Sequence, residues 1–170
     1  MLHHVSVGVA DISRAAEFYD AVLGALGYKR TAQYLPYAIA YGEGVSEFWI
    51  QLPHDNNPAG AGNGAHFGFT ARGQDAVRRF HETALANGGT DDGTPGPRPQ
   101  YGPDYYGAFV IDPFGNKIEA TFIAGENRAR GRRAEGLKRT RKAAAKRGAA
   151  RKAKAKRAGG ARKRRAARRR

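Results

Sequence analysis

The sequence contains no cysteine, which excludes disulfide bonds, zinc–thiolate clusters and thiol nucleophiles. It also has no apolar run near the roughly 20 residues that a helix needs to span a bilayer. The N-terminus lacks the apolar segment that is typical of a signal peptide. We therefore expect a cytoplasmic protein with no membrane span.

Large apolar residues are almost absent after residue 125, where Leu137 is the only one. Residues 126–170 carry 22 basic and 2 acidic side chains, whereas residues 1–125 carry 8 basic and 13 acidic ones and every aromatic residue. A segment so poor in apolar side chains cannot bury enough surface to offset the entropy lost on ordering. The sequence thus predicts a folded domain over 1–125 and a Lys/Arg/Ala-rich low-complexity tail over 126–170, disordered or partly helical.

The folded part repeats itself at an offset of 62 residues, which aligns His4 with His66. Each histidine begins a stretch with the alternation of a half-buried strand. An amphipathic helix follows in each copy, and in the first copy Asp11 is a candidate N-cap and Gly27 a stop. With the strands that come after the helices, the order is βαβββ twice, which predicts the α+β class.

The two expected modules span residues 1–53 and 64–125, and we expect their strands to form one curved mixed sheet. In the second module the apolar pattern predicts a helix near 74–87 with Phe80 and Leu85 facing inward.

The two copies place side chains suited to metal binding at positions that we align with one another. The last strands contain Ile-Gln-Leu around Gln51 and Ile-Glu-Ala around Glu119, so Gln51 is paired with Glu119 as His4 is with His66. Two imidazoles, a carboxylate and a carboxamide form a mixed N/O set suited to one divalent ion of Fe, Mn, Ni, Co or Zn. A carboxylate in an apolar strand is rarely buried without a partner, so we expect Glu119 to have one. We also expect Glu119 to be the catalytic residue.

The remaining histidines are interpreted differently. A single histidine at a strand end is more often a hydrogen-bonded structural residue than a metal ligand. We assign His3 to that class, His54 to a loop and His81 to a solvated helix position.

Three segments resemble the vicinal oxygen chelate superfamily: HVSVGVADISRAAEFYDAVLGALGYKR, GAHFGFTARGQDAVRRF and YGAFVIDPFGNKIEA. The most specific is DPFGNKIE, a hairpin followed by a ligand glutamate. The resemblance implies paired βαβββ modules whose sheet wraps around a U-shaped metal cavity. It places His4, His66 and Glu119 at three metal-ligand positions and Gln51 at the fourth. The implied chemistry is chelation of vicinal oxygens by a metal that acts as a Lewis acid.

Two functions follow from this resemblance. The first is a divalent-metal-dependent, glyoxalase-like enzyme of the lyase, isomerase or dioxygenase branch, a homodimer acting on a small oxygenated metabolite. Glyoxalase I has a carboxylate where this chain has Gln51, so we do not expect glyoxalase I turnover; the His-Gln-His-Glu set resembles methylmalonyl-CoA epimerase. The alternative is a non-catalytic small-molecule binding or resistance protein of the bleomycin-binding kind, without metal.

Residues 93–104 contain four prolines and three glycines, which predicts a long loop. Aromatic and basic side chains in and after this loop are candidates for the substrate pocket, although they fit equally well as braces of the loop. Trp49 shares the strand face of Gln51, so it is a candidate for the cavity floor or a core residue. If Arg98 faces the cavity, it implies an anionic substrate. The pocket candidates are Trp49, Arg98, Tyr101, Tyr105 and Tyr106.

The charge of the tail predicts attachment to nucleic acid without sequence specificity, and with it an association with the nucleoid. The composition also fits an anionic membrane surface, or an extension produced by a shifted reading frame in GC-rich DNA. A further alternative makes the tail the functional part and the folded domain its carrier.

Overall fold

The computed structural model describes residues 2–126. The prediction of a disordered or partly helical tail falls almost entirely on 127–170, outside the described residues. Residues 1–125 form one compact unit. In the part of the chain that the structure describes, no helix combines the length and apolar character needed to cross a membrane.

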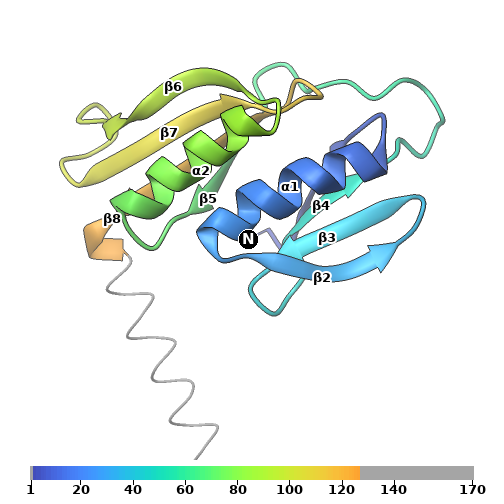
Figure 1. Cartoon of the computed structure of the whole chain (residues 1–170), viewed down its shortest axis with the longest axis horizontal. Coiled ribbons are helices and arrows are strands. Elements are labelled where there is room, and N and C mark those ends of the chain that lie inside the picture. The colour runs from blue at the N-terminus through green and yellow to red at the C-terminus, as the bar shows by residue number, and fades with distance from the viewer. Residues whose placement is uncertain (1, 127–170) are drawn as a thin grey trace, which may run out of the picture. The chain divides into compact units, whose positions relative to one another are not determined.

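The unit consists of two βαβββ modules in tandem, which confirms the predicted α+β class (Figure 1). The first module is followed by a loop that leads into the second. In chain order the elements are β1 (Val5–Gly8), α1 (Ile12–Leu26), β2 (Lys29–Tyr34), β3 (Ala38–Gly42), β4 (Phe48–Gln51), β5 (His66–Thr70), α2 (Gln74–Ala86), β6 (Thr90–Pro97), β7 (Tyr105–Ile111) and β8 (Lys117–Ile123).

The strands form two four-stranded sheets, with the orders β1-β4-β3-β2 and β5-β8-β7-β6. The first strand of each module pairs in parallel with the last strand of the same module, and the other pairs are antiparallel. We expected one continuous sheet. The hydrogen bonds instead stay within each module. The strands β1 and β5 lie at the edges of their sheets, and each pairs only with the last strand of its own module.

Helix α1 has a clear capping residue at each end. The Oδ1 atom of Asp11 accepts hydrogen bonds from the backbone N–H groups of Ser13 at 2.8 Å and Arg14 at 3.0 Å, which satisfies two donors of the first turn. Gly27 ends the helix with a φ of 92°, in the left-handed region where a Cβ is unfavourable. Both signals lie where the sequence placed them.

Helix α2 differs from expectation in two side chains. Leu85 is 41% exposed, and the neighbouring Ala84 is buried in its place. His81, which we expected in solvent, is 7% exposed, and its Nε2 atom lies 2.7 Å from Oδ1 of Asp91 at the start of β6. The hydrogen bond from His81 holds the pKa of the Asp91 carboxyl below its ordinary value. The polar partner on the next strand is what allows a histidine to be buried there.

The predicted loop over 93–104 is wrong in its first half, where β6 runs to Pro97. The strand pairs with β7 only irregularly, with register shifts on both sides of Gly93. It is an edge strand, and an edge strand tolerates proline and bulges because one side of it needs no hydrogen bonds.

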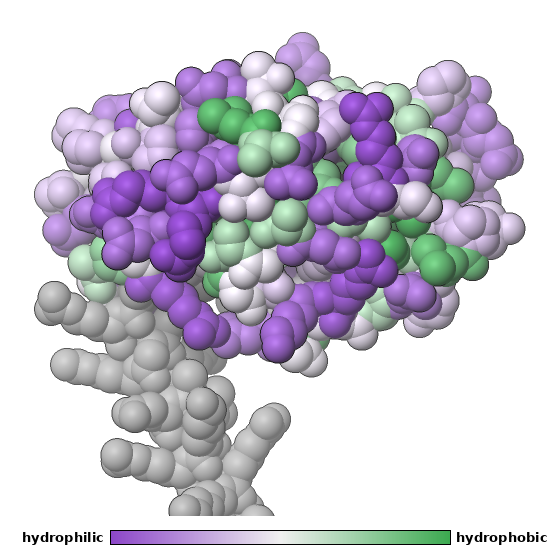
Figure 2. Space-filling view, viewed as in Figure 1, coloured by the Kyte–Doolittle hydropathy of each residue, from purple (hydrophilic) through white to green (hydrophobic). Residues whose placement is uncertain are grey.

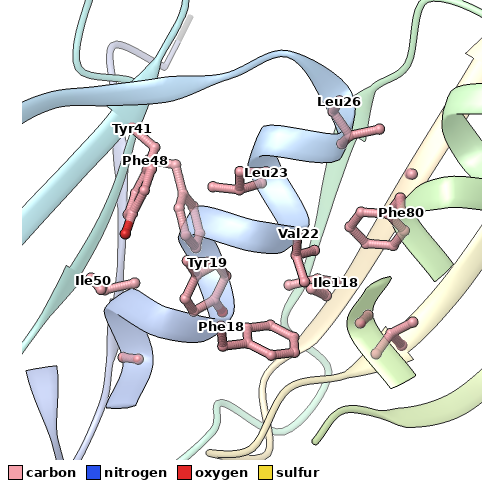
Figure 3. Packing of buried hydrophobic residues seen from close by; sticks show 14 of the residues in the cluster. Phe18, Tyr19, Val22, Leu23, Leu26, Tyr41, Phe48, Ile50, Phe80 and Ile118 are labelled. Carbon is pink, nitrogen blue, oxygen red and sulfur yellow. The ribbon is translucent and has the colours of Figure 1, made fainter. Parts of the chain in front are cut away.

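The hydrophobic core is shared by the two modules. The helices α1 and α2 lie next to each other, each over one face of its own sheet (Figure 1). Side chains of α1 such as Tyr19 and Val22 pack between Phe48 of the first sheet and Phe80 and Ile118 of the second module (Figure 3). On the helix side of the molecule the outer surface is largely hydrophilic, with apolar residues in small separate patches (Figure 2).

A buried polar network ties the turn between β7 and β8 to helix α1. The hydroxyl of Tyr19 donates a hydrogen bond to Oδ2 of Asp112 at 2.6 Å. Asp112 also accepts from the backbone of Phe114 at 2.9 Å and from the backbone and side-chain amide of Asn116 at 2.7 and 3.0 Å. The Asn116 amide reaches the carbonyl of Gly8 in the first module at 3.4 Å. Burial, together with the charge of Asp112, raises the pKa of Tyr19 well above its ordinary value.

This network makes a testable contribution to stability. In Tyr19→Phe, the buried carboxylate of Asp112 loses one donor, and we expect the free energy of unfolding to fall by about 1.5–3 kcal/mol. The control is Tyr37→Phe, because Tyr37 is 66% exposed. Denaturant titration of both variants measures the difference. Equal stability of the two variants would show that the network does not hold the modules together.

Candidate functional site

Each sheet has one face covered by a helix and one open face, on which some rows of the sheet carry small side chains. In the second module, Glu119 lies in register between Gly68 on β5 and Phe109 on β7, and Phe109 faces Gly93 on β6. The neighbouring row contains only threonine and glycine: Thr70, Thr121, Gly107 and Gly96. Glycine inside a strand often marks a place where a ligand approaches the backbone.

Glu119 is the buried charge of this open face, with 2% of its surface exposed. Its Oε2 atom lies 2.7 Å from Nε2 of His66, and its Oε1 atom accepts a hydrogen bond from the hydroxyl of Tyr105 at 2.5 Å. Burial, and then the hydrogen bond to Glu119, raises the pKa of Tyr105. The structure thus brings two expected ligands, His66 and Glu119, together, and adds Tyr105 as the residue that orients the carboxylate.

Two glycines make room for the Glu119 carboxylate. A Cβ on Gly107 would lie 2.9 Å from Oε1, and a Cβ on Gly68 would lie 3.5 Å from Oε2. The first distance is a clash and the second is ordinary van der Waals contact. Gly107 is therefore required for the observed position of the carboxylate, and sequence reasoning missed it.

Basic and aromatic side chains surround Phe109 on the same face. The ring centre of Phe109 lies 5.7 Å from that of His66, 5.6 Å from the Arg98 guanidinium and 5.0 Å from Nζ of Lys117. Arg98 donates hydrogen bonds to the carbonyls of Thr94 and Pro97 at 2.7 and 3.2 Å.

Another expected pocket residue, Tyr101, lies beside Tyr105, and a hollow lies next to His66. Tyr101 packs edge-on against Tyr105, with ring centres 5.3 Å apart. A hollow of about 440 Å³ next to His66 is lined by residues 61–65, Gly115 and Lys117. Lys117, which the sequence analysis did not select, is recognisable only once the strand register is known.

Tyr106 does not belong to the pocket. Successive residues of a strand point to opposite faces, so Tyr106 lies on the helix side, where its hydroxyl accepts a hydrogen bond from Arg78 of α2 at 2.9 Å. The structure corrects its assignment as a pocket residue.

The first module presents an aromatic cluster at the position that corresponds to His66 and Glu119. His4 is exposed, and its Nδ1 lies 2.9 Å from Nδ1 of His3. Its ring centre is 6.4 Å from that of Trp49. Trp49 in turn stacks on Tyr34, with ring centres 5.9 Å apart and the planes 18° from parallel.

The strand register corrects the alignment of Gln51 with Glu119. Ser6 pairs with Trp49 as Gly68 pairs with Glu119, because Ser6 and Gly68 are equivalent at the offset of the repeat. On the other side, Trp49 pairs with Ala40 of β3, as Glu119 pairs with a residue of β7. Trp49 is therefore the structural equivalent of Glu119. Gln51 lies two residues further along the same face, in the row of Thr121.

Within one chain, His4 does not join the other two expected ligands. Among residues 2–126, no group of three or more His, Asp and Glu side chains lies close enough to hold a metal ion. His66 and Glu119 form one half of a potential site, and His4 lies apart from them on the first module.

The geometry and the comparisons agree on the family. The family model described as the Glyoxalase/Bleomycin resistance protein/Dioxygenase superfamily matches residues 1–120. The chain belongs to this superfamily, which confirms the resemblance seen in the sequence. Members of the superfamily generally use a divalent metal and are often enzymes and dimers.

Solved structures of this family resemble the chain over the folded part. A glyoxalase/bleomycin resistance protein from Albidiferax ferrireducens is 37% identical with a TM-score of 0.65, and the match covers 72% of this chain and 98% of that chain. A glyoxalase-related enzyme from Fulvimarina pelagi is 21% identical with a TM-score of 0.57, over 72% of this chain and 87% of that chain. A lactoylglutathione lyase from Agrobacterium tumefaciens is 18% identical with a TM-score of 0.52, and the match covers 72% of this chain and 92% of that chain. The latter two share the fold. The comparison with curated proteins finds no match.

The glycine beside the carboxylate supplies a direct test of the site geometry. We expect Gly107→Ala to displace Glu119 or Tyr105 and to lower the free energy of unfolding by about 1–3 kcal/mol. The matched control is Gly68→Ala on the other side of Glu119, which we expect to stay within about 0.5 kcal/mol of the wild type. Denaturant unfolding compares the two. A tolerated Gly107→Ala variant would mean that the carboxylate shifts at little cost and that Gly107 does not fix its position.

Proposed function

We propose that the protein is a divalent-metal-dependent, glyoxalase-like enzyme that acts on a small oxygenated metabolite. The observation that carries this proposal is the pairing of His66 with Glu119 on the open face. A carboxylate is kept buried there beside an imidazole, above a floor of small side chains. Such an arrangement costs desolvation energy that a core of apolar residues would avoid.

The side chains present fit a divalent cation. An imidazole nitrogen and a carboxylate oxygen are ligands that Fe, Mn, Ni, Co and Zn share. A bound ion would supply Lewis-acid polarisation of a substrate oxygen. Tyr105 holds the Glu119 carboxylate in a fixed orientation, as residues behind metal ligands commonly do. Lys117 is paired with Asp92 at 2.6 Å, so Arg98 is the basic side chain of this face that favours an anionic substrate.

The third ligand in this proposal is His4 of a second copy of the chain. A single chain keeps His4 apart from His66 and Glu119. The first module exposes large apolar side chains that a second copy can cover. Leu2, next to the histidine pair in sequence, is 82% exposed, and Leu35 after β2 is 58% exposed. In a two-fold homodimer, each copy can supply the half that the other lacks. The metal ligands are then His4 of one copy and His66 and Glu119 of the other, with coordination positions left open for substrate.

This ligand set does not support glyoxalase I chemistry. The first module has tryptophan at the position of Glu119 and glutamine two residues later, so neither Trp49 nor Gln51 can act as a carboxylate base. We therefore place the reaction in another branch of the superfamily and remove Gln51 from the ligand set.

Metal content tests the proposal. Glu119→Gln keeps the size of the side chain and removes its negative charge, so we expect metal affinity to fall at least about tenfold. The control is His54→Ala, a change at an exposed loop histidine, which we expect to retain the wild-type content. The measurement is elemental analysis of protein purified without chelator or metal-affinity tag. Full occupancy in Glu119→Gln would contradict the assignment.

A second candidate function is non-catalytic binding of a small molecule. Trp49 at the carboxylate position favours it, because an aromatic ring binds ligands by stacking and does not bind metal. A wild-type protein that carries no metal and takes up none would favour this alternative over the enzyme.

We propose in addition that the segment 126–170 attaches the protein to nucleic acid without sequence preference. The folded part has 8 basic and 13 acidic side chains and repels phosphate, whereas this segment has 22 basic and 2 acidic ones. Charge alone is enough for such attachment. The segment has no aromatic residue, so stacking on bases does not contribute.

Removal of residues 126–170 tests this part of the proposal. We expect the truncated protein to keep the melting temperature of the full chain and to lose affinity for duplex DNA. For the full chain, log affinity should fall with log salt by about 0.9 per phosphate neutralised, equally for unrelated sequences. Fluorescence anisotropy at several salt concentrations measures this. DNA binding by the truncated protein, or its unfolding, would contradict the proposal.

A further inference from the structure

We propose that Trp49 and Tyr34 form an aromatic shelf that binds a planar ring of the ligand. This inference deepens the proposed function, on which it rests, by naming the substrate class: a small molecule with an oxygenated end and a planar ring. The shelf consists of these two residues alone, on β4 and at the end of β2.

The position of the shelf follows from the repeat. Trp49 occupies on the first module the place that Glu119 occupies on the second. The two modules therefore offer different groups at equivalent points of their open faces. One end of a site built from both faces binds through an imidazole and a carboxylate, and the other end offers an aromatic surface. A ligand that satisfies both ends must itself have two chemically different ends.

The geometry of the shelf suits a flat ring. The Trp49 and Tyr34 planes are only 18° from parallel, so a third ring can continue the same stack. Tyr34 is 63% exposed, which leaves its ring accessible. Aromatic rings stack preferentially in such parallel, displaced arrangements.

The side chains that flank the shelf in its rows of the sheet are small and uncharged, and the ring of His4 lies beside Trp49 with the ring centres 6.4 Å apart. Ser6 and Ala40 flank Trp49 in its row of the sheet, and the next row contains Gly8, Gln51 and Ala38. None of these side chains carries a charge. An uncharged ring loses little hydration against such a floor. The aromatic pair thus receives the ring of the ligand, and the half-site of His66 and Glu119 receives its oxygenated end.

The experiment uses the single tryptophan of the chain as its reporter. Mandelate and lactate share a 2-hydroxy acid group and differ in a phenyl ring against a methyl group. We titrate the full-length protein with each and follow Trp49 fluorescence, confirming affinities by calorimetry. We expect mandelate to bind at least about threefold more tightly than lactate and to change the fluorescence of Trp49.

Variants locate the effect on the shelf. Tyr34→Ala removes one ring and keeps the reporter, so mandelate affinity should fall about threefold to tenfold while lactate affinity stays unchanged. Tyr37→Ala, which removes an exposed ring three residues away, is the control and should change neither. Equal affinities for mandelate and lactate, absence of binding, or equal effects of the two variants would overturn the proposal. A Tyr34→Ala variant that changes its oligomeric state in sedimentation but keeps its mandelate affinity would also overturn the proposal. That result would assign the shelf to contact with a second copy of the chain.

The same titration with chelator separates this inference from the proposed metal centre. Ring-dependent binding of mandelate that persists without metal, in a protein with no metal content, would leave the shelf standing and remove the metal centre. A protein that holds its metal but shows no effect of Tyr34→Ala on mandelate affinity would remove the shelf and leave the metal centre standing.

Discussion

The two modules share one core on the helix side of their sheets, and this constraint decides which surfaces remain available for function. Helix α1 packs between the first sheet and residues of the second module, so the helix side of both sheets is filled. The buried Asp112 carboxylate, bonded to Tyr19 of α1, fixes the turn between β7 and β8 against the first module. A buried carboxylate is stable only with such partners, and the network therefore favours one arrangement of the modules. The faces left without a helix carry the pair of His66 and Glu119 in the second module and the pair of Trp49 and Tyr34 in the first.

On those free faces the two modules have diverged while their backbones remain equivalent. The second module keeps a buried carboxylate with an imidazole and a tyrosine hydroxyl as partners. The first module has a histidine at the same strand position, but an aromatic pair where the carboxylate would be. In our proposal the repeat thus supplies two half-sites of different chemistry, one for a cation and an oxygenated group and one for a ring. Within the residues that the structure describes, neither half gathers three His, Asp or Glu side chains close enough to hold a metal.

The sequence was sufficient for the features that depend on local pattern. The Asp11 and Gly27 ends of α1 and the repeated βαβββ order follow from capping residues and apolar periodicity. The expectation that Glu119 is buried only with a partner is also met. The alignment of Gln51 with Glu119 failed for a physical reason. Residues 49 and 51 share one face of a strand, so a period of two cannot distinguish them, and only the hydrogen-bond register does.

The other differences also depend on contacts that are distant in sequence. His81 is buried because Asp91 on the next strand accepts its hydrogen bond. The strand through Pro95 exists because it is an edge strand that needs hydrogen bonds on one side only. The room that Gly107 gives to the carboxylate is visible only when β7 and β8 are paired. These features require knowledge of which strands are neighbours, which composition and periodicity do not contain.

The central claim is that the metal centre takes His4 from one copy and His66 with Glu119 from another, and a mixture of two inactive variants tests it most directly. His4→Ala and His66→Ala each lack a ligand at both sites of a homodimer. In a heterodimer of the two, one site combines the intact His4 of one copy with the intact His66 of the other. After co-refolding of equal amounts, we expect metal content to recover to about a quarter of the wild-type value, because half of the dimers are mixed and each has one complete site. Metal content that stays at the level of the separate variants would contradict a site shared between copies.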